Sequence, residues 1–221
     1  MISVRPMNAG DRERLRLWRT APELARYRFQ GASISIASHE AWFRAIPQHS
    51  RWIVEYDQVA VATLNLADVA PEHRTGRWGF YIADQNYRRR NIGSYCEYWI
   101  QQYVFDGLGF FKLWGEVLAT NGPMLRIHDA FGFRREGLFR AHVLKDEERI
   151  DVVRIGMLAE EWQRVRAHNA DILHKKGLSV PDLPANVVWP DTPRSVPSNL
   201  SQQLGMSDAE ADELFLKAAI F

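Results

Sequence analysis

The segment that most constrains this chain runs from residue 81 to residue 94. A run of aromatic and β-branched residues ends where the segment begins, and the longest helical pattern of the chain starts where it ends. The loop between them holds three consecutive arginines, residues 88–90, followed by Asn91 and Gly93. A helix start presents unpaired N–H groups and the positive end of the helix dipole. Because Asn and Gly tolerate a positive φ, those groups can converge on a phosphate. The segment therefore predicts a strand, an anion-binding turn and a helix.

Alternating helical and strand-like patterns fill the chain as far as Ala167. Apolar residues that recur every three or four positions predict helices, and short β-branched or aromatic runs between turn residues predict strands. The predicted helices are 11–18, 22–27, 38–46, 92–103, 123–130 and 159–167, and the predicted strands are 51–56, 59–66, 76–82, 113–118, 137–145 and 149–158. This order predicts one mixed α/β domain without an internal repeat.

Composition and charge exclude several classes of protein. Hydrophobic residues make up 46% of the 221 residues, which is enough for a packed core and excludes a globally disordered chain. The formal net charge of +1 gives no chain-wide electrostatic reason to bind nucleic acid or an anionic membrane. Cys96 is the single cysteine, so an internal disulfide is excluded, and no Cys/His cluster has zinc spacing. We expect a chain that binds no nucleic acid, membrane or metal.

The N-terminal residues bear on where the protein resides. Arg5 and Pro6 stand where a signal peptide needs its apolar region. No stretch approaches the roughly 18 uninterrupted apolar residues of a membrane span. A lone cysteine is typical of a reducing compartment. We therefore expect a cytoplasmic protein, with Cys96 buried in the core rather than acting as a nucleophile.

A second segment follows the arginine-rich loop along the chain. A predicted strand ends near Asn121, a helical pattern follows, and Gly132 lies between two phenylalanines in the next turn. Three arginines alone are typical of a solvated surface turn, but the two segments in this order resemble the GCN5-related N-acetyltransferase (GNAT) superfamily. The phosphate loop of that family has the pattern Gln/Arg-x-x-Gly-x-Gly/Ala. Arg88, Asn91 and Gly93 match it, with asparagine in place of the first glycine.

The resemblance covers residues 2–163 and implies both a fold and a cofactor. The implied fold is α/β, with a mixed, mostly antiparallel central sheet that is flanked by helices and splays at the acetyl-CoA site. Acetyl-CoA, the acetyl donor, is expected to lie with its pyrophosphate on backbone N–H groups of the loop and its pantetheine arm along the splayed strand. Asn121 matches the family asparagine that contacts this arm. The residues expected to bind acetyl-CoA are Phe80, Tyr81, Ile82, Arg88, Arg89, Arg90, Asn91, Ile92, Gly93, Ser94 and Asn121.

Two residues are candidates for the proton transfers that acetylation of an amine requires. Most relatives protonate the departing thiolate with a tyrosine, and the family register counted from Asn121 places His128 at that position. Histidine, with an ordinary pKa of about 6.5, can donate a proton at neutral pH. Glu116, on the strand beside the donor, is expected to take the ammonium proton directly or through water. The alternatives are a helix histidine packed near the next turn and an ordinary carboxylate at a sheet edge.

Segments outside the common core resemble the nucleotide-sugar N-acetyltransferases of the pseudaminic acid pathway, which serve flagellin and glycan modification. These segments are 17–19, 38–43, 134–143, 151–152 and 161–162. The resemblance implies a UDP-linked 4-amino-4,6-dideoxy sugar as acceptor. Arg19 is then expected to pair with the diphosphate, His39 to hydrogen-bond it, and Trp42 to stack on the uracil or sugar. Trp42 is equally typical of helix-packing core, and Arg19 of a surface ion pair.

Other acceptors and one other class stay open. Ribosomal-protein N-terminal acetyltransferases and spermidine acetyltransferases share the arrangement, so peptide and polyamine acceptors are alternatives. A polyamine enzyme favours an acidic acceptor groove, for which the near-balanced charge gives little support. A catalytically silent acyl-CoA-binding or regulatory domain is the alternative from another class, and the asparagine at 91 and the histidine at 128 are the departures that suggest it.

Prolines divide the chain into a domain and a tail. Half of the ten prolines lie between residues 181 and 197, where regular structure is expected to stop. We expect a GNAT acetyltransferase domain over 1–167, a proline-rich extended connector over 168–206 and a short amphipathic helix over 207–221, which begins with a capping box. The tail is expected to contact its own domain, the second subunit of a homodimer, or a partner.

Overall fold

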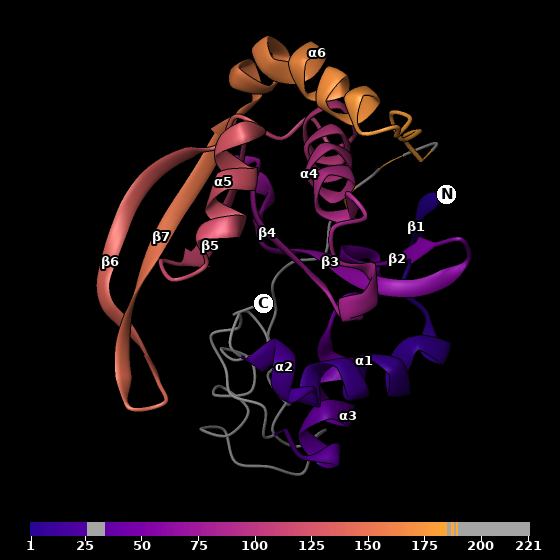
Figure 1. Cartoon of the computed structure of the whole chain (residues 1–221), viewed down its shortest axis with the longest axis vertical. Helices are drawn as coiled ribbons and strands as arrows, with labels where there is room; N and C mark the ends of the chain where they lie inside the picture. The colour runs from indigo at the N-terminus through magenta and orange to yellow at the C-terminus, as the bar shows by residue number, and fades with distance from the viewer. Residues whose placement is uncertain (26–33, 185–186, 188, 190–221) are drawn as a thin grey trace.

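The computed structural model describes residues 1–25, 34–184, 187 and 189. Within these ranges, seven strands form one sheet in the order β1-β2-β3-β4-β5-β7-β6 (Figure 1). Neighbouring strands are antiparallel except β4 and β5, which are parallel. The expected mixed, mostly antiparallel α/β sheet is confirmed. The strands are β1 (Ile2–Pro6), β2 (Arg51–Tyr56), β3 (Val59–Ala70), β4 (Thr75–Ile82), β5 (Lys112–Leu118), β6 (Arg134–Lys145) and β7 (Glu148–Leu158).

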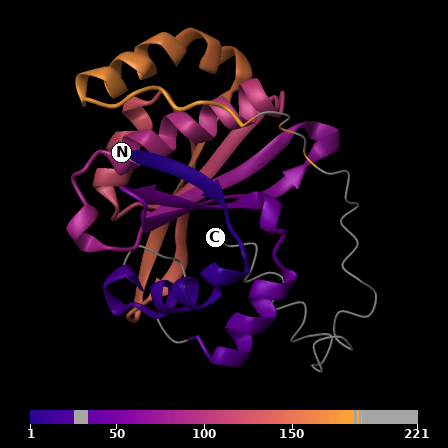
Figure 2. The same cartoon turned by 90° about the vertical axis from the view of Figure 1, so that its right-hand side faces the viewer.

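Helices cover both faces of the sheet (Figures 1 and 2). One face carries α1 (Arg12–Thr20), α2 (Pro22–Ala25) and α3 (Ile36–Ala45), and the other carries α4 (Ile92–Gln102), α5 (Gly122–Ala130) and α6 (Ala159–Lys175). A π-helical turn, Tyr103–Gly107, continues α4, and short 3₁₀ turns occupy Ala9–Asp11, Gln48–Ser50, Pro71–His73 and Gln85–Tyr87. The sheet is therefore the middle layer of three.

Alternation along the strands gives the sheet two different faces. In β2, Trp52 and Val54 belong to the larger core, where the Trp52 ring packs edge-on against Trp99 of α4 at 5.1 Å between centroids. Ile53 points the other way and joins a second core with Trp42 of α3. Most of the apolar core therefore lies between the sheet and α4–α6, and a smaller core lies beneath α1–α3.

Strands β4 and β5 pair only where both begin. Their parallel ladder joins residues 75–77 to residues 112–114. β4 continues to Ile82 and β5 to Leu118 with no further pairing between them. The separated edges present backbone N–H and C=O groups that need other partners. The splay that the family resemblance implies is confirmed.

The hairpin between β2 and β3 turns on two residues, as the sequence predicts. Asp57 has a φ of 49° and Gln58 a φ of 65°. A positive φ at both central positions is the requirement of a type I′ turn, whose twist matches that of the flanking strands. The turn therefore forms although Gln58 stands where glycine is usual.

The first strand is an element that the sequence patterns did not predict. β1 pairs antiparallel with β2 from Ile2 opposite Tyr56 to Pro6 opposite Trp52. It is an edge strand, and an edge position accepts a proline because the missing N–H faces away from the ladder. The short alternation before Pro6 was too brief to indicate a strand.

Helix α6 is longer than expected and continues to Lys175 instead of ending at Ala167. Its added turns are fixed to the core: Asn169 Nδ2 donates to Gln101 Oε1 and to the carbonyl oxygen of Phe131, both at 2.9 Å. Leu173, one turn later, is fully buried. Residues 168–175 of the expected connector are therefore helical. The helix expected over 207–221 lies outside the described residues.

Candidate active site

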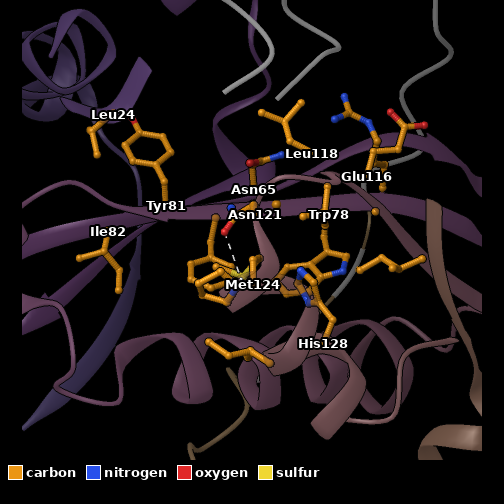
Figure 3. Close-up of a pocket in the computed structure, with 18 of the residues that line it drawn as sticks. Leu24, Asn65, Trp78, Tyr81, Ile82, Glu116, Leu118, Asn121, Met124 and His128 are labelled. Carbon is orange, nitrogen blue, oxygen red and sulfur yellow. Dashed lines mark hydrogen bonds between the residues drawn. The ribbon is translucent and has the colours of Figure 1, made fainter. Parts of the chain in front are cut away.

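A cavity of about 460 Å³ lies where β4 and β5 separate (Figure 3). Its size is in the range of roughly 300 to 1,000 Å³ that is usual for small-molecule sites. Because the opening passes through the sheet, residues from both faces line it. They are Leu24, Asn65, residues 77–82, Arg88, Arg89, residues 115–118, Asn121, Pro123, Met124, Ile127, His128 and Ile155.

The turn before α4 has the backbone that anion binding requires. Asn91, which precedes the first helical residue, has a φ of 61° and a ψ of 12°, in the left-handed region. Glycine reaches this conformation freely, and asparagine tolerates it better than most residues do. Arg89 also has a positive φ, 65°. The first N–H groups of α4 have no intrahelical partner, and the positive end of the helix dipole lies there. Asparagine in place of the family glycine therefore preserves the turn.

The residues expected to hold acetyl-CoA fall into two groups around this turn. Side chains that line the cavity are those of Phe80, Tyr81, Ile82, Arg88, Arg89 and Asn121. Asn91, Ile92, Gly93 and Ser94 do not line it and instead form the turn and the first helical residues. Arg90 points elsewhere, with its Cζ 5.3 Å from the ring centroid of Tyr56 and 5.5 Å from that of Tyr87. The cation of Arg90 is thus directed away from the cavity.

Asn121 lies at the start of α5, where β5 ends. Its Oδ1 accepts a hydrogen bond from the backbone N–H of Met124 at 3.4 Å (Figure 3), so it caps the helix. The Nδ2 group is the other polar end of the Asn121 amide, and the residue lines the cavity. Capping fixes the side chain and leaves its NH₂ group as the donor for a ligand.

His128 of α5 lies in the wall of the cavity, where its side chain is almost completely buried. Its Nδ1 is 2.6 Å from Oε1 of Glu97 on α4, and Glu97 is fully buried. The imidazole packs edge-on against Trp78 at 5.4 Å between ring centroids (Figure 3). It also packs edge-on against Phe133, at 5.6 Å between centroids. Burial raises the pKa of Glu97, and its interactions with His128 oppose that rise. Since Nδ1 is occupied by Glu97, Nε2 is the nitrogen left for a ligand.

Glu116 lines the cavity from β5. It stands opposite Arg154 of β7 in the strand register, and Arg154 Nη1 donates to Glu116 Oε1 at 2.8 Å. The guanidinium of Arg154 lies flat on Trp114, with Cζ 3.3 Å from the ring centroid. About one fifth of the Glu116 side chain is exposed. A stacked and paired arginine therefore holds this carboxylate at the edge of the cavity.

The three residues expected to bind a nucleotide sugar lie together where α1, which holds Arg19, packs on α3, which holds His39 and Trp42. Cζ of Arg19 is 3.7 Å from the ring centroid of Trp42, and both residues border a small cavity of about 10 Å³. His39 is fully buried and borders neither cavity. Its Nε2 is 2.9 Å from the carbonyl oxygen of Arg12 and its Nδ1 is 3.3 Å from Nη1 of Arg19.

The hydrogen bonds of His39 define its role in this structure. Burial lowers the pKa of His39 and so favours the neutral ring. A neutral ring that donates from Nε2 to the carbonyl of Arg12 accepts at Nδ1 from Arg19. His39 therefore orients Arg19, and its burial removes it from direct contact with an acceptor, contrary to the expectation from the sequence.

Several residues of the site carried no sequence motif. Asn65, Arg77 and Trp78 line the main cavity, Arg51 lines the small one, and Glu97 contacts His128. The signal that could have found the polar members is their place inside apolar runs. Glu97 follows Cys96 on the buried side of a helix, and Asn65 lies between two leucines of a buried strand. A polar residue in such a position is buried, and it needs a partner or a ligand.

The parallel strand pair that opens onto a cavity, with a left-handed turn at the start of α4, has the arrangement that the sequence resemblance implies for an acetyltransferase fold. Residues 2–134 match the model of the acetyltransferase (GNAT) domain. This match covers more than half of the chain, which therefore belongs to the GNAT acetyltransferase family.

Individual relatives agree with this assignment. The SPbeta prophage-derived uncharacterized N-acetyltransferase YokL of Bacillus subtilis (strain 168) is 26% identical over 111 residues. That match spans 50% of this chain and 62% of YokL, so the chain covers less than two thirds of this relative.

Solved structures share the fold at low sequence identity. The spermidine N-acetyltransferase from Vibrio cholerae, in complex with CoA and spermine, is 17% identical with a TM-score of 0.68, over 73% of this chain and 98% of that one. A GCN5-related N-acetyltransferase from Brucella melitensis is 22% identical with a TM-score of 0.63, over 76% and 80%. In the part of the chain that the structure describes, no helix combines the length and apolarity needed to cross a membrane.

Proposed function

We propose that this protein transfers the acetyl group of acetyl-CoA to an amine of a small acceptor. The observation that carries the proposal is the cavity between the separated parts of β4 and β5, which connects Arg88 and Arg89 at the anion-binding turn with His128. CoA carries phosphates at one end and the thioester at the other. One donor molecule along this cavity has its pyrophosphate at the start of α4 and its acetyl group near His128.

The unpaired edge of β4 supports the donor arm. Pantetheine contains amide groups, and the backbone of residues 78–82 has no strand partner on the β5 side. Backbone hydrogen bonds from this edge hold the arm extended, and Asn121 adds a side-chain amide. An N–H of the same edge polarises the acetyl carbonyl, where negative charge develops during attack.

Two proton transfers complete the reaction. Glu116 accepts a proton from the acceptor ammonium, directly or through water, and the neutral amine then attacks the carbonyl carbon of the thioester. The carbon–nitrogen bond forms, the carbon–sulfur bond breaks, and the nitrogen loses its second proton to water. Nε2 of His128 donates a proton to the departing CoA thiolate. His128 regains a proton from water, and Glu116 releases its proton to solvent. The products are the N-acetylated acceptor, free CoA and one proton.

The class of amine has two supported candidates. Segments around Arg19 and Trp42 support an amino-sugar nucleotide. The spermidine enzyme of Vibrio cholerae supports a polyamine through its shared fold and its complex with spermine. An N-terminal peptide amine is the third acceptor that the sequence resemblance leaves open. Each is an amine whose attack needs the same donor site.

An acceptor panel tests the function. Purified protein is incubated with acetyl-CoA and, separately, a UDP-4-amino sugar, spermidine and N-terminal peptides, and CoA release is measured. We expect amine-dependent release, and His128→Ala is expected to lower turnover by about 100-fold or more, because an acid in position contributes on that order. The exposed His168 of α6 provides a matched control, His168→Ala.

The outcomes separate the catalytic roles from the donor site. Acetyl-CoA binding, followed by calorimetry, is expected to survive in His128→Ala. If His128→Ala and His128→Phe both keep full turnover across the pH range, the general-acid role is wrong. If the wild-type protein neither binds acetyl-CoA nor releases CoA with any amine, the proposed function itself is wrong.

A further inference from the structure

The sheet face covered by α1–α3 carries a row of polar side chains across three strands. Arg51 of β2 pairs with Asn65 of β3, and Asn65 pairs with Gly79 of β4. Arg77 precedes Gly79 by two residues and so points to the same face. Arg51, Asn65 and Arg77 are only 7%, 6% and 5% exposed. Two guanidinium groups and an amide are therefore buried beneath helices that otherwise pack apolar residues against this face.

Arg51 is a buried cation without a counter-charge in the described part of the chain. Its side chain makes no hydrogen bond or ion pair with any described residue, and its Nε is buried without an acceptor. Its Cζ lies 4.9 Å from the ring centroid of Trp42. Burial, reinforced by the charges of Arg19 and Arg77, lowers the pKa of Arg51 to about 9, so the group is still protonated at neutral pH. A buried charge of this kind is costly unless a ligand supplies the opposite charge.

Arg77 brings a second unsatisfied donor to the main cavity. Its Nε donates to Asp68 Oδ2 at 2.5 Å, while its Nη2 is buried without a partner among the described residues. Arg77 lines the main cavity and Arg51 the small one, and Asn65 and Tyr81 line both. The two spaces therefore adjoin at Asn65 and Tyr81 (Figure 3 shows both residues).

The balance of charge around the two cavities is positive. Arginines 77, 88 and 89 line the main cavity, and Arg19 and Arg51 line the small one. Among the described lining residues, Glu116 is the one carboxylate, and Arg154 pairs with it. Asp68, which lines neither cavity, pairs with Arg77, so the excess positive charge is that of the other arginines. A polycation would be repelled by these arginines, whereas an anion would supply the counter-charge that the buried Arg51 lacks among the described residues.

We propose that the acceptor amine carries an anionic group, a carboxylate or a phosphate, that binds between Arg51 and Arg77 beside Asn65. The small cavity has room for about one water molecule, so the anion lies at its mouth, where the main cavity begins. The amine of the same molecule then reaches the opening between β4 and β5 from the α1–α3 side, opposite the donor. This inference rests on the proposed function and names the class of acceptor.

Matched pairs of amines test the charge preference. The first pair is 5-aminopentanoate and 1,5-diaminopentane, and the second is 2-aminoethyl phosphate and ethane-1,2-diamine. Within each pair the reacting amine is the same and the far group differs, and the two pairs separate carboxylate from phosphate. We expect kcat/KM to favour the anionic member of at least one pair by about tenfold or more, the scale of one hydrogen bond to a charged group.

Variants test whether the arginines cause the preference. Arg51→Gln and Arg77→Gln are each expected to lower kcat/KM for the anionic amine by about tenfold or more relative to the diamine, so that the preference for the anionic amine is lost. Arg51→Lys keeps the charge and is expected to retain part of the preference. The exposed Arg164 of α6 provides the control, Arg164→Gln. Unchanged acetyl-CoA affinity in each variant shows that the donor site still folds.

Direct binding of anions tests the inference independently of catalytic activity. Glutarate and inorganic pyrophosphate are titrated by calorimetry into wild-type protein saturated with CoA. Binding that Arg51→Gln or Arg77→Gln weakens supports the anion site. A preference for the diamines, or wild-type protein that binds neither anion, overturns it. Failure of the proposed function is distinct, since it shows as loss of acetyl-CoA binding and of CoA release with every amine.

Discussion

Nδ1 of His128 and Oε1 of Glu97 lie 2.6 Å apart and join α5 to α4 inside the core. Both side chains are buried, and the indole of Trp78 packs edge-on against the imidazole. A histidine held in this way has one nitrogen fixed and the other free for proton transfer. Glu97 thus acts on the proposed chemistry through His128, as a positioning residue.

Replacing Glu97 by glutamine is expected to lower turnover. The amide fills the same space but cannot carry the charge of a carboxylate, so it holds the imidazole of His128 less firmly with Nε2 toward the donor. We expect kcat to fall by about 10- to 100-fold, with little change in the KM for acetyl-CoA, and the limb of the pH–rate profile on which activity falls with rising pH to change position. Glu160→Gln, on an exposed part of α6, is the matched control. A pH–rate profile identical to that of wild type would assign Glu97 a structural role alone.

The same substitution predicts a pH-dependent change in stability. Burial raises the pKa of Glu97 above its ordinary value, so the folded state binds this proton more tightly than the unfolded state does. The contribution of this proton to the free energy of unfolding is fully present below the pKa of about 4.3 that Glu97 has in the unfolded chain. It is lost as pH rises toward the pKa in the folded protein, and the free energy of unfolding then falls by up to about 1.4 kcal/mol per pH unit. Glu97→Gln lacks this slope. Urea unfolding of both proteins from pH 4 upward measures the difference, and parallel curves would contradict it.

Much of the architecture follows from local patterns in the sequence. Strand alternation and turn residues predict β2 through β7 closely, and β2, β3, β5 and β7 place apolar side chains on covered faces. The predicted end of α6 at Ala167 was wrong because the polar residues around Asn169 are typical of the start of a connector. Only the folded chain shows its amide bonded to Gln101 and Phe131.

The site was predicted unevenly for a related reason. The left-handed turn before α4 is contiguous in sequence, so Asn91 and Gly93 reveal it. Glu97 and His128 come from different helices, and Arg51 meets Arg77 only across three paired strands. The contact of Glu97 with His128, and the position of Arg51 and Arg77 on one face of the sheet, depend on tertiary pairing, which leaves no spacing in a single sequence. The buried position of His39 is a further example, since its partners lie on α1.

Asn91 is expected to tolerate glycine and to resist alanine. Its φ of 61° is left-handed, which glycine adopts freely and alanine adopts at a cost of about 1 kcal/mol. Asn91→Ala should lower the free energy of unfolding by about that amount and weaken acetyl-CoA binding, because the N–H groups of the turn are displaced. Asn91→Gly should stay close to wild type in both, apart from the loss of the 3.4 Å contacts with Lys176. Equal acetyl-CoA affinity in the two variants, measured by calorimetry, would show that the turn does not bind the donor.

Glu116→Gln is expected to depress activity most at low pH. The acceptor is then mostly an ammonium ion, and removal of its proton limits the rate. At high pH the free amine is abundant, so the variant should approach wild type. The glutamine also loses the ion pair with Arg154, so unfolding is measured in parallel. Glu72→Gln, at an exposed turn, is the control. A pH–rate profile of unchanged shape would remove Glu116 from the mechanism.

Truncation at two points is expected to separate the folded domain from the rest of the chain. A chain that ends at Trp189 keeps α6 and the residues after it that pack on the core, including Leu178 and Leu183. It should retain the unfolding free energy and the acetyl-CoA affinity of the full chain. A chain that ends at Ala167 loses Asn169 and Leu173, both fully buried.

The shorter chain should be destabilised by about 3 kcal/mol or more, because a buried leucine and a buried hydrogen-bonded amide are removed together. It also exposes the apolar surface of α4 and α5 that α6 covers. Chemical denaturation of the two truncated chains beside the full chain measures both effects. Equal unfolding free energies for all three chains would show that residues 168–175 contribute nothing to stability. A loss of activity in the longer truncation alone would place a functional role in residues 190–221, because its described core is intact.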